Sequence, residues 1–207
     1  MSEANLFGAM ASARRSRRGL LLLVSAVSLA AAGRTGAQPA AVEKPRESLV
    51  KAAFLHKFAS FVEWPAGTFP QLSTHLRIAI IGDDQVWRDL RELARDRDRD
   101  GRPVDVERLS PGESLSGFHI AYLKASTPAR ITELISHAPE GVLTIADSDG
   151  AHPRGSVLSF FLDDGRVRFG VSPEAAARQK LRLDRRLLSI ARTVQGAAPA
   201  RRWPALG

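Results

Sequence analysis

The chain has 207 residues, of which 44% are hydrophobic and 25% charged, a globular composition that argues against disorder along the whole length. It contains no cysteine, which excludes disulfides, thiolate nucleophiles, cysteine-based zinc sites and acylated cysteine anchors. Lys and Arg number 30 against 22 Asp and Glu, and this net charge of +8 would by itself suit nucleic-acid binding.

Residues 1–37 have the pattern of a secretory signal peptide. The basic run 14–18 is followed by the apolar run Leu20–Ala32 and by small residues, so cleavage is expected after Ala37 or a few residues earlier. The apolar run is shorter than the ~20 residues of a membrane-spanning helix, although a retained anchor is the alternative. Ser16–Leu21 also resembles a twin-arginine signal, which leaves the export route open. The sequence therefore predicts a periplasmic protein.

Removal of this segment halves the basic excess, because the segment contains five Arg and one Glu. The remaining basic residues are interleaved with acids, as in the stretch from Arg95 to Arg102, where Arg and Asp alternate. Alternating signs cancel the field that would attract a phosphate backbone. No nucleic-acid partner is therefore expected.

Residues 38–46 are predicted to be a short linker, and Ser48 is expected to cap a helix that runs to about Glu63. Trp64-Pro65 would end this helix, because the residue before a proline avoids helical backbone angles. Hydrophobic patterning then predicts a strand Leu76–Ile81, a helix around Val86–Ala94, strands Pro103–Leu109 and Phe118–Leu123, a helix after Thr127-Pro128 that reaches Ala138, and a strand Val142–Ala146.

The C-terminal part has a different pattern. Val157–Leu162 and Arg166–Val171 flank Asp163-Asp164-Gly165, which predicts a β-hairpin. A short helix is predicted from Pro173, a final helix face over Leu187–Val194, and a flexible tail over 196–207. Strands that alternate with helices imply a parallel sheet covered on both faces. We therefore predict one three-layer α/β sandwich over residues 47–195, with a mostly parallel sheet to which the hairpin adds an antiparallel edge.

No arrangement of residues points to catalysis. Phosphate-binding glycine loops and the Gly-x-Ser-x-Gly motif are absent, and the five His lack metal-ligand spacing. Asp83-Asp84 follows a strand as in phospho-acceptor domains, but Lys124 stands where such a domain needs an aspartate, so a helix cap is favoured. Asp147–Gly150 is favoured as a plain turn over half a calcium loop. We expect a non-enzymatic protein without metal or cofactor.

The first helix carries the most informative pattern. Lys51 falls in the middle of its apolar face, close to Leu55 and Phe58. One interpretation is that its stem packs while its ammonium reaches water. The other is that it lies at the rim of an apolar pocket and meets an anion or a partner carboxylate. Loss of Lys51 is expected to cost little stability. Of the aromatic residues Phe54, Phe58, Phe61 and Trp64, Trp64 is the one expected to be partly exposed, because it stands beside a proline at the helix end.

The segment Lys51–Pro65 (KAAFLHKFASFVEWP) resembles the opening helix of the YfiR-like family of periplasmic proteins. Leu76–Asp83, Val157–Val171 and Leu181–Val194 resemble later parts of that family, in order. The resemblance implies a compact α/β sandwich and an exported regulator. Together with the pattern of the first helix, it indicates these candidates for binding a partner or ligand: Lys51, Phe54, Lys57, Phe58, Phe61, Glu63, Trp64 and Arg168.

The resemblance also implies a set of partners. The family's name member is a dimeric repressor that holds the periplasmic domain of an inner-membrane signalling protein, a diguanylate cyclase, inactive. It thereby limits cyclic-di-GMP and biofilm formation, and an outer-membrane lipoprotein can sequester it. Its redox control through cysteine pairs is excluded here, because this chain has no cysteine. The alternative function is a periplasmic small-molecule-binding sensor domain, which would show an enclosed pocket with convergent polar groups.

Overall fold

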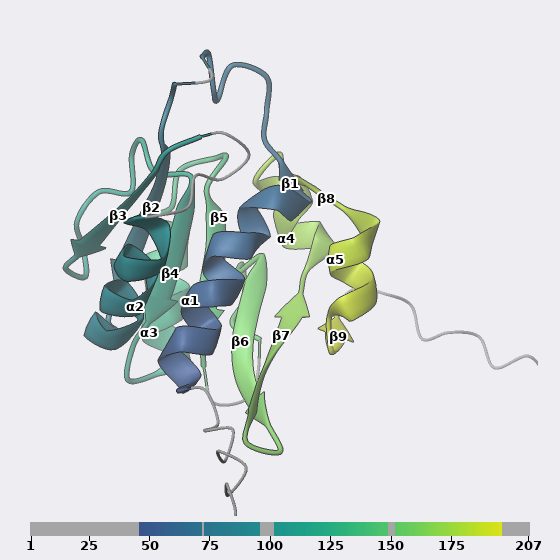
Figure 1. Cartoon of the computed structure of the whole chain (residues 1–207). Helices are drawn as coiled ribbons and strands as arrows, with labels where there is room; N and C mark the ends of the chain where they lie inside the picture. The colour runs from purple at the N-terminus through teal and green to yellow at the C-terminus, as the bar shows by residue number, and fades with distance from the viewer. Residues whose placement is uncertain (1–45, 72, 96–101, 149–151, 196–207) are drawn as a thin grey trace, which may run out of the picture. The chain divides into compact units, whose positions relative to one another are not determined.

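The computed structural model describes residues 46–71, 73–95, 102–148 and 152–195 (Figure 1). These residues belong to one compact unit, Glu43–Gly207. The expected signal peptide 1–37, all but the last residue of the expected linker 38–46, and the expected tail 196–207 lie outside the described residues. In the part of the chain that the structure describes, no helix combines the length and the apolar character needed to cross a lipid bilayer.

The centre of the described fold is a seven-stranded sheet. Its strands, in the order β3-β2-β4-β5-β6-β7-β9, are β2 (Leu76–Ile81), β3 (Val104–Leu109), β4 (Ile120–Lys124), β5 (Leu143–Asp147), β6 (Leu158–Asp163), β7 (Arg166–Val171) and β9 (Thr193–Val194). The neighbours from β3 to β6 are parallel, β6 and β7 form an antiparallel hairpin, and β9 is parallel to β7. The predicted mostly parallel sheet is confirmed, although β9 rather than the hairpin forms its edge.

Helices cover both faces of this sheet, and α1 and α2 lie side by side on one of them (Figure 1). The helices are α1 (Glu47–Phe58), α2 (Asp84–Arg95), α3 (Pro128–Ser136), α4 (Pro173–Arg178) and α5 (Arg185–Ile190). Alternate residues of a strand point to opposite faces. Ile78 and Ile80 of β2 therefore pack in one core with α1 and α2, whereas Ala79 and Ile81 pack in a second core with α3. This three-layer α/β sandwich is the predicted fold class.

The first helix is shorter than predicted. It ends at Phe58 and is followed by a 3-10 turn, η1 (Ala59–Phe61), and by strand β1 (Val62–Glu63), which pairs antiparallel with β8 (Arg182–Leu183). The predicted helix to Glu63 was wrong because Val62 is extended, and pairing with β8 satisfies backbone groups there instead of helical hydrogen bonds.

The last helix is also shorter than predicted. It ends at Ile190, after which Ala191 is extended and Thr193–Val194 pairs with β7 as strand β9. The expectation that Val194 continues the helix face was therefore wrong. This pairing depends on a close approach at Gly170, where a Cβ would lie 2.6 Å from Oγ1 of Thr193.

Side-chain caps were predicted for two helix starts, and the structure has one of them. Oδ1 of Asp83 accepts hydrogen bonds of 3.0 Å from the backbone N–H groups of Gln85 and Val86, so the predicted cap of α2 is confirmed. Ser48 does not cap α1, because it lies inside the first turn and the residue at the cap position is Arg46.

The turn of the predicted hairpin has the expected chemistry. Asp164 and Gly165 have φ angles of 50° and 64°, both in the left-handed region. Tight two-residue hairpin turns require such angles, which is why Asp-Gly is a favoured pair there.

Candidate functional site

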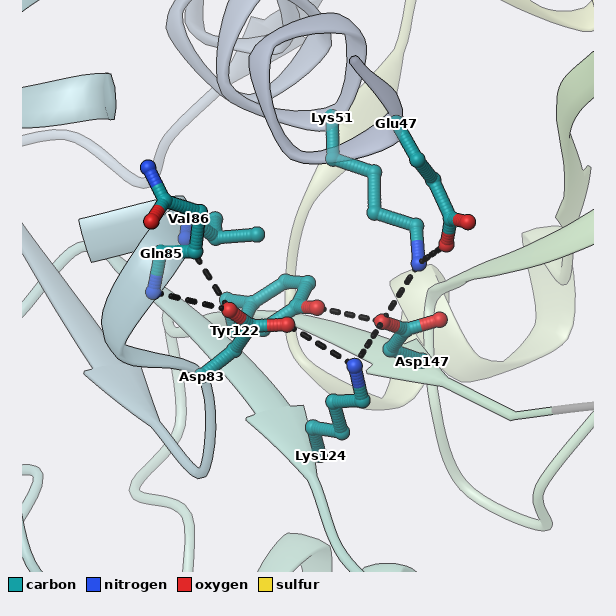
Figure 2. A network of polar contacts seen from close by, with 8 residues as sticks. All are labelled: Glu47, Lys51, Asp83, Gln85, Val86, Tyr122, Lys124 and Asp147. Atoms are coloured by element: carbon teal, nitrogen blue, oxygen red, sulfur yellow. Dashed lines mark hydrogen bonds and ion pairs between the residues drawn. The ribbon is translucent and has the colours of Figure 1, made fainter. Parts of the chain in front are cut away.

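A network of buried charges connects α1 to the sheet (Figure 2). Nζ of Lys51 donates hydrogen bonds to Oδ2 of Asp147, at 2.7 Å, and to Oε1 of Glu47. The side chains of Lys51 and Asp147 are only 4% and 5% exposed. Lys51 therefore does not extend into water, which contradicts the first interpretation of its place in the sequence, and the carboxylate that it meets belongs to the same chain.

Tyr122 completes the buried part of this network. Its hydroxyl donates a hydrogen bond to Oδ2 of Asp147, the same oxygen that accepts from Lys51. Burial raises the pKa of the Tyr122 hydroxyl far above its usual value, and the charge of Asp147 raises it further. The hydroxyl is therefore protonated and acts as a hydrogen-bond donor at neutral pH.

Lys124 extends the network towards solvent. Its Nζ donates to Oδ2 of Asp83 at 2.8 Å and lies 3.7 Å from Oδ2 of Asp147. Burial lowers the pKa of Lys124, but the hydrogen bond with Asp83 and the charge of Asp147 outweigh burial and hold it above its usual value. Burial raises the pKa of Asp83, yet Lys124 and the backbone N–H of Val86 hold it below its usual value. Both groups are charged at neutral pH.

The topology explains why these groups meet. Asp83 follows β2, while Lys124 and Asp147 end β4 and β5, and the carboxyl ends of neighbouring parallel strands lie along one edge of the sheet. Gly82 lets the turn after β2 approach β4 closely, because its φ is +85° and a Cβ there would lie 2.0 Å from the carbonyl oxygen of Lys124. The first turn of α1 then covers this edge with Lys51.

A second feature is a groove of about 590 Å³ between α1 and the β6–β7 hairpin. Its apolar lining comes from Val50 and Phe54 of α1 and from Leu162 of the hairpin, which is 48% exposed. Its charged lining consists of Glu47, Arg166 and Arg168, and within the described residues neither guanidinium group pairs with a side chain. The groove thus combines an accessible apolar surface with two arginines and the carboxylate of Glu47.

The aromatic residues of α1 differ in their accessibility. The ring of Phe58 is 5.0 Å from that of Phe169 and 5.7 Å from that of Phe160, measured between centroids, and Phe58 is 1% exposed. Phe54 stacks on Phe58 but is half-buried and borders the groove. Phe58 is therefore a core residue, whereas Phe54 can touch a ligand or partner.

The chain after α1 is held by a separate aromatic stack. Trp64 is half-buried and packs edge-on against Phe69, with 5.6 Å between their centroids. Phe69 lies in turn 4.4 Å from the ring of His119 and 4.3 Å from the guanidinium carbon of Arg102. The Trp64 indole N–H is buried and has no hydrogen-bond partner among the described residues.

The candidate residues from the sequence fall into four places. Lys51 lies in the network, Phe58 in the core, Phe54 and Arg168 along the groove, and Lys57, Phe61, Glu63 and Trp64 along the rest of α1, η1, β1 and the loop that follows. Phe54 and Arg168 are the candidates that the fold brings together from distant parts of the chain. Lys57 and Glu63 are exposed, and Glu63 lies 3.8 Å from Arg182.

The other members of the charge network are the functional candidates that sequence reasoning missed. Asp83, Lys124 and Asp147 each have a simpler explanation in the sequence, as a helix cap, a strand end and a turn. The available signal was that a charged residue ends or follows each of three buried strands whose carboxyl ends meet. Tyr122 gave no such signal, because an aromatic residue in a buried strand is expected to be core.

The chemistry that this network offers is electrostatic. No group of three or more His, Asp or Glu side chains within the described ranges is arranged to hold a metal ion. Lys51 and Asp147 neutralise each other, while Lys124 and Glu47 present opposite charges that are 44% and 46% exposed. Such an arrangement can bind and orient a polar group.

Comparison with protein families identifies a match. A family model described as YfiR/HmsC-like matches residues 48–192. This range contains every residue of the groove and of the network except Glu47, which belongs to both. No curated protein matches the chain.

Proposed function

The chain belongs to the YfiR/HmsC-like family, and from that premise we propose that it is an exported, non-enzymatic regulator. It binds the periplasmic sensory domain of an inner-membrane signalling protein, a diguanylate cyclase, and represses it. It thereby limits cyclic-di-GMP and biofilm formation. The observation that carries this proposal is the match over residues 48–192, which spans nearly all described residues.

Export is the first part of the proposal. Residues 1–37 are removed as a signal peptide, and the mature protein acts in the periplasm. Intact-mass measurement of periplasmic material should find a chain that begins near Gln38 and dissolves without detergent. An uncut chain in the membrane fraction would contradict this part.

The groove supports the second part, which is where the partner binds. Its accessible apolar lining, with Phe54 and Leu162, can take an apolar side chain of the partner. Arg166 and Arg168 would meet carboxylates beside that side chain, because neither guanidinium group pairs with a side chain in the part of the chain that the structure describes. The homodimer and the outer-membrane lipoprotein that the family resemblance implies are further partners in this proposal.

A genetic experiment tests the repression. Deleting the gene should raise cellular cyclic-di-GMP, and the wild-type gene should restore the low level. Arg168→Glu should fail to restore it, since a reversed charge would repel the carboxylates of the partner, while its melting temperature should stay near that of the wild type. Arg88→Glu, on the exposed surface of α2, is the matched control and should restore the low level. Unchanged cyclic-di-GMP after the deletion would refute repression of a cyclase, and full restoration by Arg168→Glu would refute the groove.

The second candidate function is a periplasmic small-molecule-binding sensor domain. The observation that favours it is a cavity of about 250 Å³ beside the charge network, lined in part by Lys51, Lys124 and Asp147. The two functions differ in what the deletion does. Loss of a repressor raises cellular cyclic-di-GMP, whereas a sensor binds its ligand even if the level of cyclic-di-GMP does not change.

A further inference from the structure

A small cavity lies at the carboxyl ends of β4 and β5, next to the buried charges. Its volume is about 250 Å³, and its polar lining consists of Glu47, Lys51, Lys124, Ser126, Asp147 and Ser148. Ligands of open α/β sheets bind outside the carboxyl ends of the strands, near the point where the strand order reverses. Here the order reverses at β2, whose neighbours β3 and β4 lie on opposite sides, so the cavity lies at the same edge of the sheet, beside the end of β4 and next to that point.

The cavity is lined by two carboxylates and two ammonium groups, in a definite arrangement. Lys51 and Asp147 are buried and paired at 2.7 Å, so their charges cancel. Glu47 and Lys124 are about half exposed, and Figure 2 shows them on opposite sides of that pair, one on α1 and the other at the end of β4. A molecule in the cavity would therefore meet the carboxylate of Glu47, which also pairs with Lys51, on one side and the ammonium of Lys124, which also pairs with Asp83, on the other.

Stability alone is a weak reason for this arrangement. A buried ion pair can often be replaced by packed apolar residues without loss of stability, because desolvation offsets most of the attraction between the charges. Lys51 is buried on α1 beside apolar residues, where a Leu or Met would complete the core with Leu55 and Phe58. A role in binding explains why charged side chains line a cavity at this place.

We propose that the cavity binds a small zwitterion that carries one ammonium and one carboxylate group. The ammonium lies against Glu47, and the carboxylate lies against Lys124 and the hydroxyl of Ser126. A lone anion would meet the carboxylates of Glu47 and Asp147, and a lone cation would meet two lysines, so a single charge of either sign fits poorly. The volume is below the ~300 Å³ lower limit of pockets for drug-sized molecules, so the ligand has the size of a small amino acid. This site goes beyond the proposed repression and does not depend on it.

Titrations of the mature protein with simple probes test this proposal. Glycine, β-alanine and γ-aminobutyrate present the two charges at increasing separation, and acetate and methylamine present one charge each. At constant ionic strength, at least one of the three zwitterions should raise the melting temperature saturably. Acetate and methylamine, alone or mixed, should not. In NMR spectra, the best zwitterion should shift the amide signals of Lys124–Ser126 and of Ser148.

Two variants and a control link that binding to the cavity. Glu47→Gln and Lys124→Met remove the accessible charges and leave the Lys51–Asp147 pair in place, and the melting temperature of each variant without a probe shows whether it is folded. Each should weaken binding at least about tenfold, which is about 1.4 kcal/mol. Lys57→Met removes an exposed lysine of α1 that does not line the cavity, and it should bind as the wild type does. The proposal is overturned if no zwitterion raises the melting temperature, or if a mixture of acetate and methylamine raises it as much as the zwitterions do. It is also overturned if both cavity variants bind the best zwitterion as the wild type does.

Discussion

Replacing Lys51 with Met keeps most of the side-chain volume and removes the charge. Asp147 would remain buried, with the Tyr122 hydroxyl and the more distant Lys124 ammonium, 3.7 Å away, as its partners. Removing one member of a buried ion pair costs about 3–5 kcal/mol. Because Asp147 keeps two partners, we expect the lower end of that range, about 3 kcal/mol. This reverses the expectation from the sequence alone that Lys51 contributes little to stability.

Thermal and urea unfolding of the mature protein measure this cost. A domain of about 150 residues loses about 2–4 °C per kcal/mol, so Lys51→Met should lower the melting temperature by about 6–12 °C. Adding Asp147→Asn should recover about 1–3 kcal/mol relative to the sum of the single variants, since no unpaired charge then stays buried. Lys57→Met, on the exposed side of α1, should change stability by less than about 0.5 kcal/mol. An unchanged melting temperature for Lys51→Met, or additive single effects, would refute the reasoning.

Three further predictions concern stability. Phe58→Ala should lower the free energy of unfolding by about 3–5 kcal/mol in urea titrations, because it leaves a cavity among buried aromatic rings. Burial lowers the pKa of His119 and that of His152 below 6.5, and two nearby guanidinium groups lower the pKa of His119 further. The unfolded chain therefore binds protons first, so the melting temperature should fall as pH drops below about 6.5, and His119→Gln should reduce that slope. Gly82→Ala should reduce the yield of folded protein or its melting temperature, because the added Cβ would meet the carbonyl oxygen of Lys124 at 2.0 Å.

The main elements of the fold were predictable because their signals are local. β2 runs over Leu76–Ile81 as the apolar run predicted, and the Asp164-Gly165 turn fixes the hairpin. The two-residue strands were not predictable, because so short a segment has no periodicity of its own. Val62 is a strand residue because Leu183 lies beside it, and Val194 because Val171 does.

The site was predictable only in part, for a related reason. Periodicity places Lys51 on the apolar face, but the same pattern suits a lysine that extends to water and one that is buried. The deciding residue is Asp147, 96 positions further along the chain. The groove shows the same limit, since Phe54 and Arg168 meet only through the packing of α1 against the hairpin.

The pairing of Lys51 with Asp147 also constrains the order in which the chain can fold. α1 is the first described helix, so it emerges from synthesis or export before any strand of the sheet on which it packs. Until β5 has followed, Lys51 has no buried counter-ion, and seating α1 on a partial sheet would bury an unpaired charge. The charge therefore disfavours early, incorrect docking of this helix and postpones its attachment until the parallel strands are assembled. Such long-range contacts are characteristic of slow folding, so the apolar face of α1 stays accessible to chaperones in the meantime.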